Sequence, residues 1–197
     1  NGDGNTDLIV HGESFPILLL YENSETNSLK RVTNSHFEAV LSGDIEIADF
    51  NNDQILDILY TGANIGNKMK TKLLASAGSQ GIYEDTFFEE EYGVTVGDIS
   101  VGDLNGDELQ DFFVFGSNFE FDDKISIYLN AGSNGFNQLQ SPSFVRMVNG
   151  KSQISDIDKD NDLDIIVMGR PVSNNSDEIF KKYLNNGSGG FTVGPND

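Results

Sequence analysis

The sequence predicts an all-β protein in which one small sheet is repeated four times along the chain. An acidic loop that runs into a short apolar strand ending in glycine occurs four times, as NGDGNTDLIVHG, DFNNDQILDILYTG, DLNGDELQDFFVFG and DIDKDNDLDIIVMG. The last aspartates of these loops, Asp7, Asp57, Asp111 and Asp164, follow one another at intervals of 50, 54 and 53 residues. No segment has the apolar period of a long amphipathic helix.

The third repeat shows the expected strands most clearly. Residues 94–101 form an approach strand with partial apolar alternation, the acidic loop follows, and residues 111–115 form a short apolar strand closed by Gly116. Residues 124–130 (KISIYLN) alternate polar and apolar side chains, and a turn at Asn134 and Gly135 leads into a last strand over residues 136–139. The second and fourth repeats follow the same order, whereas the first lacks the turn glycines. Each repeat is therefore expected to form one antiparallel sheet of four strands.

Four-stranded sheets repeated at this interval are typical of β-propeller blades, which pack around a shared axis because one blade cannot bury its core alone. A β-solenoid is the alternative, but its repeats would be shorter. We expect residues 1–197 to form a single β-propeller unit of about four blades, with repeats that begin near residues 1, 43, 94 and 151. Because Asn1 falls at the third position of a loop, we expect the chain to be a fragment of a larger propeller.

The acidic loops carry oxygen side chains at positions 1, 3, 5 and 9, counted from the first aspartate of a complete loop. Calcium takes roughly six to eight oxygen ligands, and a turn with carboxylate or amide oxygens at alternate positions can point them at one centre. The backbone carbonyl at position 7 is the expected extra ligand. We therefore expect three to four Ca²⁺ ions per chain. The predicted ligands are Asn1, Asp3, Asn5 and Asp7 in the first loop, Asp49, Asn51, Asp53, Ile55 and Asp57 in the second, Asp103, Asn105, Asp107, Leu109 and Asp111 in the third, and Asp156, Asp158, Asp160, Asp162 and Asp164 in the fourth.

Alternatives to a calcium loop fit these residues less well. An EF-hand would need a bidentate Glu at position 12 and flanking helices, but Tyr60, Val114 and Val167 stand there inside apolar strands. Magnesium is a weaker candidate because it demands tight octahedral geometry, and zinc would need His or Cys. Asp and Asn also form Asx turns at strand ends without any metal. Repeated, closely spaced carboxylates would repel one another if left empty, which favours a metal.

Loop position 6 separates the four candidate sites. The sharp turn there favours glycine, which only the first loop has, as Gly4, whereas Gln54, Glu108 and Asn161 stand in the others. Asn tolerates a left-handed backbone, but Gln and Glu should cost about 1 kcal/mol. We therefore expect the second and third sites to be weaker than the fourth.

The loop pattern resembles the FG-GAP and VCBS repeats, which are the calcium-loop blades of integrin α-subunit propellers and of many bacterial secreted proteins. The segment YLNNGSGGF, residues 183–191, is similar to the third strand and turn of a VCBS repeat. The resemblance implies a seven-bladed or similar propeller with one calcium ion between the first and second strands of a blade, in an extracellular or cell-surface protein. Four repeats are about half of such a ring. Either blades are missing from this chain, or two chains associate to complete the ring, or the ring is unusually small.

Two classes of function follow from these observations. The leading hypothesis is a calcium-stabilised, non-catalytic module for binding or adhesion that recognises a protein or a carbohydrate through loops on one face. The alternative is the propeller domain of a secreted polysaccharide-active enzyme, a lyase or hydrolase. His11 and His36 are the only histidines, and Asp44 with Glu46 is a candidate acid–base pair, but each is more simply a strand or turn residue. The sequence contains no convincing catalytic constellation.

The charge and composition of the chain argue against other partners. The net charge is −20, and the 12 Lys and Arg are scattered without a basic stripe, so we expect no binding to nucleic acid or to anionic membranes. The longest apolar stretch, residues 15–21, is too short to cross a bilayer, so no membrane insertion is expected. With no cysteine, the fold depends on neither disulfides nor thiolate metal sites.

Overall fold

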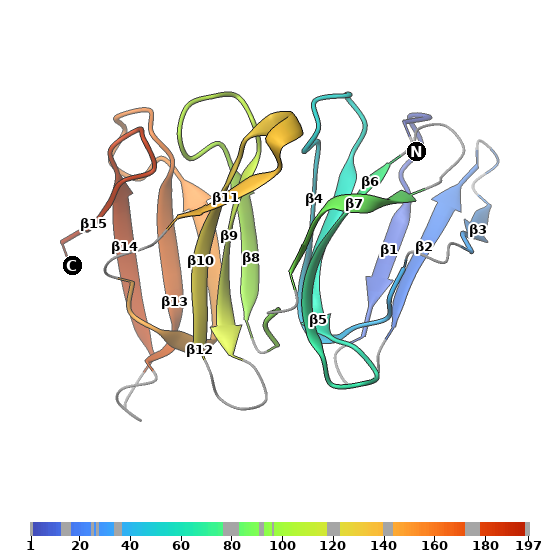
Figure 1. Ribbon diagram of the computed structural model, residues 1–197, viewed down its shortest axis with the longest axis horizontal. Coiled ribbons are helices and arrows are strands. Elements are labelled where there is room, and N and C mark those ends of the chain that lie inside the picture. The colour runs from blue at the N-terminus through green and yellow to red at the C-terminus, as the bar shows by residue number, and fades with distance from the viewer. Residues whose placement is uncertain are drawn as a thin grey trace. The chain divides into compact units, whose positions relative to one another are not determined.

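The computed structural model contains four antiparallel sheets (Figure 1). It describes residues 2–12, 17–24, 26, 28–33, 37–76, 83–90, 93–95, 97–117, 123–139, 144–171 and 178–195, with the backbone alone for residues 83–90 and 123. No α-helix occurs in these ranges, which confirms the predicted all-β class, and none of their segments is a helix that could span a membrane. The chain divides into two compact units, Asn1–Thr95 and Val96–Asp197, each with two of the sheets.

The first unit holds the sheets of the first two repeats. The first sheet has the order β1-β2-β3, with bounds Leu8–His11, Leu18–Asn23 and Leu29–Arg31. The second has the order β4-β5-β6-β7, with bounds Leu41–Ala48, Asp57–Ala63, Met69–Ser76 and Tyr83–Glu90. The prediction of four strands per repeat is therefore wrong for the first repeat. Its three strands are the equivalents of the second, third and fourth strands of the other repeats.

The second unit holds the third and fourth repeats, each with four strands as predicted. The third sheet has the order β8-β9-β10-β11, with bounds Asp98–Gly102, Asp111–Ser117, Asp123–Asn130 and Phe136–Leu139. The fourth has the order β12-β13-β14-β15, with bounds Met147–Ser155, Asp164–Pro171, Ile179–Asn185 and Phe191–Val193. A 3₁₀ turn, Gly132–Asn134, joins β10 to β11 at the predicted turn.

The glycine after the loop ends the strand in the first repeat, where β1 stops at His11 before Gly12, but not in the other three, contrary to the prediction. β5 continues through Gly62 to Ala63, and β9 through Gly116 to Ser117. Gly62 has a φ of +150°, and a Cβ there would lie 2.9 Å from the Cβ of Val40. Glycine is required because a neighbouring segment approaches the backbone, which is a second use of this residue within strands.

Within each unit, one sheet packs on the next by the same rule. Side chains alternate between the two faces of a strand. In the second unit, Phe113 and Phe115, at the second and fourth positions after the loop aspartate of β9, share a core with Ile165 and Val167 of β13. These two residues are the first and third after their own loop aspartate. In the first unit, Ile9 of β1 packs on the core that contains Ile58 and Tyr60 of β5. The two faces of a sheet therefore have different roles in packing.

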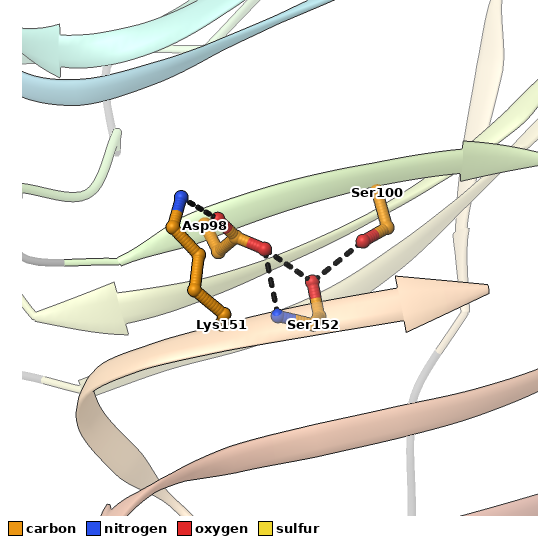
Figure 2. A network of polar contacts seen from close by, with 4 residues as sticks. All are labelled: Asp98, Ser100, Lys151 and Ser152. Carbon is orange, nitrogen blue, oxygen red and sulfur yellow. Dashed lines mark hydrogen bonds and ion pairs between the residues drawn. The ribbon is translucent and has the colours of Figure 1, made fainter.

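A buried carboxylate joins the first strands of the third and fourth sheets (Figure 2). Asp98 of β8 is 3% exposed, and its Oδ2 accepts hydrogen bonds from the backbone N of Ser152 at 2.7 Å and from its Oγ at 2.8 Å. The Oδ1 of Asp98 binds the Nζ of Lys151, and the Oγ of Ser100 lies 2.7 Å from that of Ser152. Because the carboxylate is buried and its partner lysine is mostly exposed, the bonds to Ser152 carry most of its stabilising effect.

We expect Asp98→Ala to lower the free energy of unfolding by about 2 to 3 kcal/mol, because the half-buried N–H and hydroxyl of Ser152 lose a charged acceptor. Lys151→Met keeps the aliphatic stem and should cost less than about 1 kcal/mol, since its ion pair is screened. Chemical denaturation of both variants measures the difference. Equal losses in the two would mean that the exposed ion pair is the dominant contact.

Candidate metal centres in the acidic loops

The aspartate at loop position 9 connects each loop to the third strand of its own sheet or, in the three-stranded first sheet, to β2. In the second loop, Asp57 Oδ2 accepts a hydrogen bond from Phe50 N at 2.9 Å and Oδ1 accepts one from Ser76 N at 2.8 Å. The same pair of bonds recurs at Asp111 and Asp164, where the donors are Leu104 with Asn130 and Ile157 with Asn185. These three aspartates are fully buried. In the first loop, Asp7 Oδ1 accepts the corresponding bond from Asn23 N at 2.9 Å.

The aspartate at position 1 organises the backbone of the loop. Asp103 Oδ1 accepts from Gly106 N at 2.7 Å, and its Oδ2 accepts from Glu108 N at 2.8 Å. Asp49 and Asp156 accept equivalent bonds from the N–H groups at loop position 6, which belong to Gln54 and Asn161. The loops therefore wrap around this carboxylate, which is the geometry that Asx turns provide.

The side chains at positions 3 and 5 also bond within the loop. The side-chain Nδ2 of Asn105 donates to Asp107 Oδ2 at 3.0 Å, and the Oδ1 of Asp107 accepts from Leu109 N at 2.9 Å. Asn51 donates in the same way to Asp53 in the second loop. In the first loop, Asp3 accepts from Asn5 N, which is again a bond from position 7 to position 5. The bond from position 7 to position 5 is therefore common to all four loops, whereas the side-chain donor at position 3 occurs in the second and third.

The backbone of every loop is left-handed at positions 4 and 6. At position 6 the φ angles are +83° for Gly4 and 69°, 67° and 75° for Gln54, Glu108 and Asn161. At position 4 the four residues are Gly2, Asn52, Gly106 and Lys159, all with positive φ. The expectation of a sharp turn at position 6 is confirmed in all four loops. The left-handed backbone at position 4 was not predicted. Three of the four loops have Gly or Asn there, and this preference could have indicated it.

The fourth loop brings carboxylates together as a cation site requires. Oxygens of Asp156, Asp158 and Asp164 all lie within 4.8 Å of one another. Desolvation and the charges of Asp160 and Asp164 raise the pKa of Asp158, so a cation among these groups would relieve electrostatic repulsion. The donors are all oxygens, which suits a hard cation such as calcium. The residues of this loop therefore fit a calcium ion.

The second and third loops have Asn51 and Asn105 at position 3, where the fourth has Asp158. Among the described residues, the fourth loop holds the one group of three acidic side chains at such distances, and Asp160 is not a member of it. The predicted carboxylates Asp49, Asp53, Asp57, Asp103, Asp107 and Asp111 lie around their loops in the hydrogen-bonded positions given above. Asn1 lies outside the described residues. The carbonyls of Asn5, Ile55, Leu109 and Asp162 remain predicted ligands.

Burial raises the pKa of two position-9 aspartates. Desolvation raises the pKa of Asp57 to about 6, although the backbone N–H groups of Ser76 and Phe50 act in the opposite direction. The pKa of Asp111 is raised to about 6 for the same reason, against the N–H groups of Asn130 and Leu104. Repulsion from the other carboxylates of each loop adds to both shifts. A nearby cation would favour the charged form of both groups.

Sequence reasoning missed a pair of asparagines that hold these loops in place. Asn130 Nδ2 donates to the carbonyl of Gln110, at position 8 of the third loop, at 3.2 Å. Asn185 Nδ2 donates to the carbonyl of Leu163 in its own loop at 2.9 Å and to that of Leu104 in the preceding loop at 2.7 Å. Recurrence of Asn after Tyr-Leu in the third strand, at Asn130 and Asn185, was the signal that could have identified them.

The candidate catalytic groups are separate from the loops. His11 ends β1 and is half-buried, whereas His36 lies outside the described residues. Asp44 and Glu46 lie on one face of β4 because they are two residues apart. In the Asp98 network, the Oγ of Ser152 donates to a carboxylate, and Lys151 binds that carboxylate, so neither group is arranged as a nucleophile with its base.

Comparison with known proteins identifies the repeat. The model of an FG-GAP-like repeat matches residues 1–60 and 103–167, which is more than half of the chain. No curated protein matches the chain significantly. Among solved structures, a fucose lectin from Kordia zhangzhouensis in complex with methyl-fucoside is similar over 77% of this chain and 96% of that chain, with 12% sequence identity and a TM-score of 0.48. A similarity this weak assigns no ligand to this chain.

The raised pKa values predict how the stability of the metal-free protein depends on pH. Asp57 and Asp111 bind protons more tightly in the folded state than in the unfolded state, so their contribution is present at about pH 4 and is lost as the pH rises through 6. We expect stability to fall by on the order of 2 kcal/mol per group over this window. Thermal melts of the chelator-treated protein at a series of pH values measure this change in stability. The same melts of Asp111→Asn should show a shallower dependence of stability on pH. An identical pH dependence in this variant would contradict the assignment.

Relief of the left-handed backbone gives a second prediction. Glu108→Gly at position 6 should raise the free energy of unfolding of the metal-free protein by up to about 1 kcal/mol, because glycine adopts this φ without strain. Gly4→Ala at the same position of the first loop should have the opposite sign. Urea denaturation of both variants compares them directly. A loss of stability in Glu108→Gly would show that the Glu108 side chain makes a compensating contact.

Proposed function

This chain belongs to the family of FG-GAP-like repeats, and we propose that it is a calcium-stabilised, non-catalytic binding module whose four repeats are blades of a β-propeller. The single observation that carries the proposal is the group of three convergent carboxylates, Asp156, Asp158 and Asp164, in the fourth loop. When bound there, calcium would neutralise the carboxylates and hold the loop closed. Asp160 and the carbonyl of Asp162 complete the proposed ligand set.

The shared loop geometry supports calcium in the remaining loops. Left-handed residues at positions 4 and 6 and the carboxylate at position 1 recur in all three complete loops. In the second and third loops the position-3 ligand would be the side-chain oxygen of Asn51 or Asn105. Each of these sites therefore has one carboxylate fewer than the fourth. Since ligand charge helps to set calcium affinity, we propose that the fourth site binds most tightly.

The propeller arrangement is supported by the packing rule within each unit. Both units place the second residue after one loop aspartate, Ile9 or Phe113, in a core with the first and third residues after the next, and in the second unit the fourth residue, Phe115, joins it. An interface that is repeated in this way joins successive sheets without a limit on their number, as propeller blades require. We propose that residues 1–197 supply four blades of such a ring.

We propose a protein or carbohydrate as the partner and an extracellular or cell-surface location. Ions that fix loops beside the first and second strands of each blade would pre-organise one rim of the sheets for recognition, since binding residues are commonly carried on loops of a rigid scaffold. The excess of negative charge favours partners that are neutral or basic. A glycan array and a pull-down with basic or neutral surface proteins separate the two kinds of partner.

Calorimetric titration tests the calcium sites. We expect three to four ions per chain for the wild type, and a chelator should lower the melting temperature because it removes the ions that offset the loop charges. Asp158→Ala should reduce the number of bound ions by one or lower the calcium affinity of the fourth site at least tenfold. Asp162→Ala is the matched control in the same loop, because the proposed ligand there is the backbone carbonyl. Absence of calcium binding in the wild type, or an equal loss in the two variants, would contradict the proposal.

A further inference from the structure

A series of buried hydrogen bonds joins the position-9 aspartates of the third and fourth loops. The backbone N of Asn185 donates to Asp164 Oδ1 at 2.9 Å, and its side-chain Nδ2 donates to the carbonyl of Leu104 at 2.7 Å. Leu104 in turn donates its own backbone N–H to Asp111 Oδ2 at 2.8 Å. Because Asp164 and Asp111 are both predicted ligands, three hydrogen bonds in series connect one candidate metal centre with the next.

The residues of this series are shielded from water. Asp111, Asp164 and Leu104 are buried, and Asn185 is 6% exposed. A hydrogen bond in such surroundings is costly to break, because the freed N–H or carbonyl group finds no water in place of its partner. A shift in the backbone of one loop is therefore transmitted to the other loop instead of being absorbed by the loss of a bond.

The Asn185 side chain is held in one orientation. Its Oδ1 accepts a hydrogen bond from Asn186 N at 2.8 Å, so the Nδ2 faces the carbonyls of Leu104 and Leu163. Both hydrogens of the amide are thus used, one on each loop. Leu104 is at position 2 of the third loop, and Leu163 directly precedes Asp164 in the fourth. The amide therefore fixes the beginning of one loop relative to the end of the other.

The turn after Asn185 lies next to the same two loops. Gly187, between β14 and β15, has a φ of +74°, and a Cβ there would lie 2.6 Å from Oδ2 of Asp162, at position 7 of the fourth loop. A Cβ at Gly106, position 4 of the third loop, would lie 4.0 Å from the carbonyl oxygen of Gly187. The turn thus adds a second contact between the loops beside the hydrogen bonds of Asn185.

The first unit has a different residue at the equivalent position. Ser76 ends β6 as Asn185 ends β14, and its backbone N donates to Asp57 as that of Asn185 donates to Asp164. A serine hydroxyl has one hydrogen, so it cannot donate to a carbonyl of each of two loops at once. The two-carbonyl bridge is therefore a feature of the third and fourth loops that the second repeat cannot reproduce.

We propose that Asn185 couples calcium binding in the third and fourth loops, so that an ion in either loop raises the affinity of the other. This inference rests on the proposed calcium sites and gives a positioning role to a residue that is not a ligand. Binding of a cation restricts the backbone of a loop, which has a cost in conformational entropy. A loop that is ordered in this way also fixes its neighbour through Asn185, so the second ion meets a loop whose ordering cost is partly met.

Site-specific titration by NMR tests the coupling in the full chain. Asp107→Ala removes an exposed carboxylate at position 5 of the third loop and leaves every residue of the hydrogen-bond series unchanged. We expect it to lower the calcium affinity of the fourth site, followed at the backbone amide of Asn161, roughly fivefold. Because coupling between two sites is reciprocal, Asp158→Ala should lower the affinity of the third site, followed at Glu108, by the same factor.

Two further variants separate the bridge from other effects. Asp53→Ala is the matched control, because it removes the carboxylate at the same position of the second loop, in the first unit. It should change the affinity of the fourth site by less than about twofold, since only screened electrostatic effects remain. Asn185→Ser copies Ser76 and should abolish the effect of Asp107→Ala on the fourth site. A purely structural role of Asn185 would lower the melting temperature and leave that effect in place.

The outcomes distinguish the coupling from calcium binding itself. Unchanged affinity of the fourth site in Asp107→Ala, an equal loss in Asp53→Ala, or persistence of the effect in Asn185→Ser would overturn the coupling while the calcium sites stand. Absence of calcium binding to the wild type would contradict the proposed function, and the coupling would fail with it. If Asn185→Ser does not fold, hydrogen exchange replaces it. In Asp107→Ala, calcium at the fourth site should slow exchange of the Leu104 amide, and unchanged exchange there would overturn the proposal.

Discussion

The buried aspartate at loop position 9 is the constraint on which each repeat depends. Its two oxygens accept backbone N–H groups from the beginning of the loop and from the end of the third strand, as Asp111 does from Leu104 and Asn130. A carboxylate is needed because a neutral side chain of this size has a single acceptor oxygen. Burial of that charge is unfavourable, and desolvation raises the pKa of Asp57 and Asp111. The repeat thus holds a buried negative charge beside its loop, and a bound cation would reduce the unfavourable energy of that charge.

Most of the architecture could be predicted because each repeat is defined by residues that lie close together in the sequence. Loop aspartates at nearly constant intervals predicted the number of sheets. Apolar alternation predicted β10 to within one residue, and the turn at Asn134 and Gly135 predicted β11. The three-stranded first sheet did not follow, because its loop and β1 carry the same local pattern as the loops and second strands of the four-stranded sheets. The end of the loop strands was also missed, since glycine was taken as a terminator where Gly62 instead admits a neighbouring segment.

The candidate site was predictable in its residues but not in its geometry. Spacing alone put oxygen atoms at alternate positions of four loops, yet within the described part of the chain only the fourth loop gathers Asp156, Asp158 and Asp164 closely. The difference arises at position 3, where the second and third loops have Asn51 and Asn105, each of which donates a hydrogen bond to the aspartate at position 5. An ionised aspartate cannot donate such a bond, and Asp158 instead adds a third carboxylate to the group in the fourth loop. One exchange of Asn for Asp therefore changes the charge that a loop offers to a cation.

The amide of Asn185 has a consequence for how this kind of chain can evolve. It donates to Leu163 of its own repeat and to Leu104 of the repeat before it, so one side chain satisfies carbonyls that lie far apart in the sequence. Excision of the fourth repeat would leave the buried carbonyl of Leu104 without this donor. A gene duplication preserves this hydrogen bond when it copies a repeat together with the preceding repeat whose carbonyl accepts the bond. The unit that is duplicated most easily is therefore a pair of repeats.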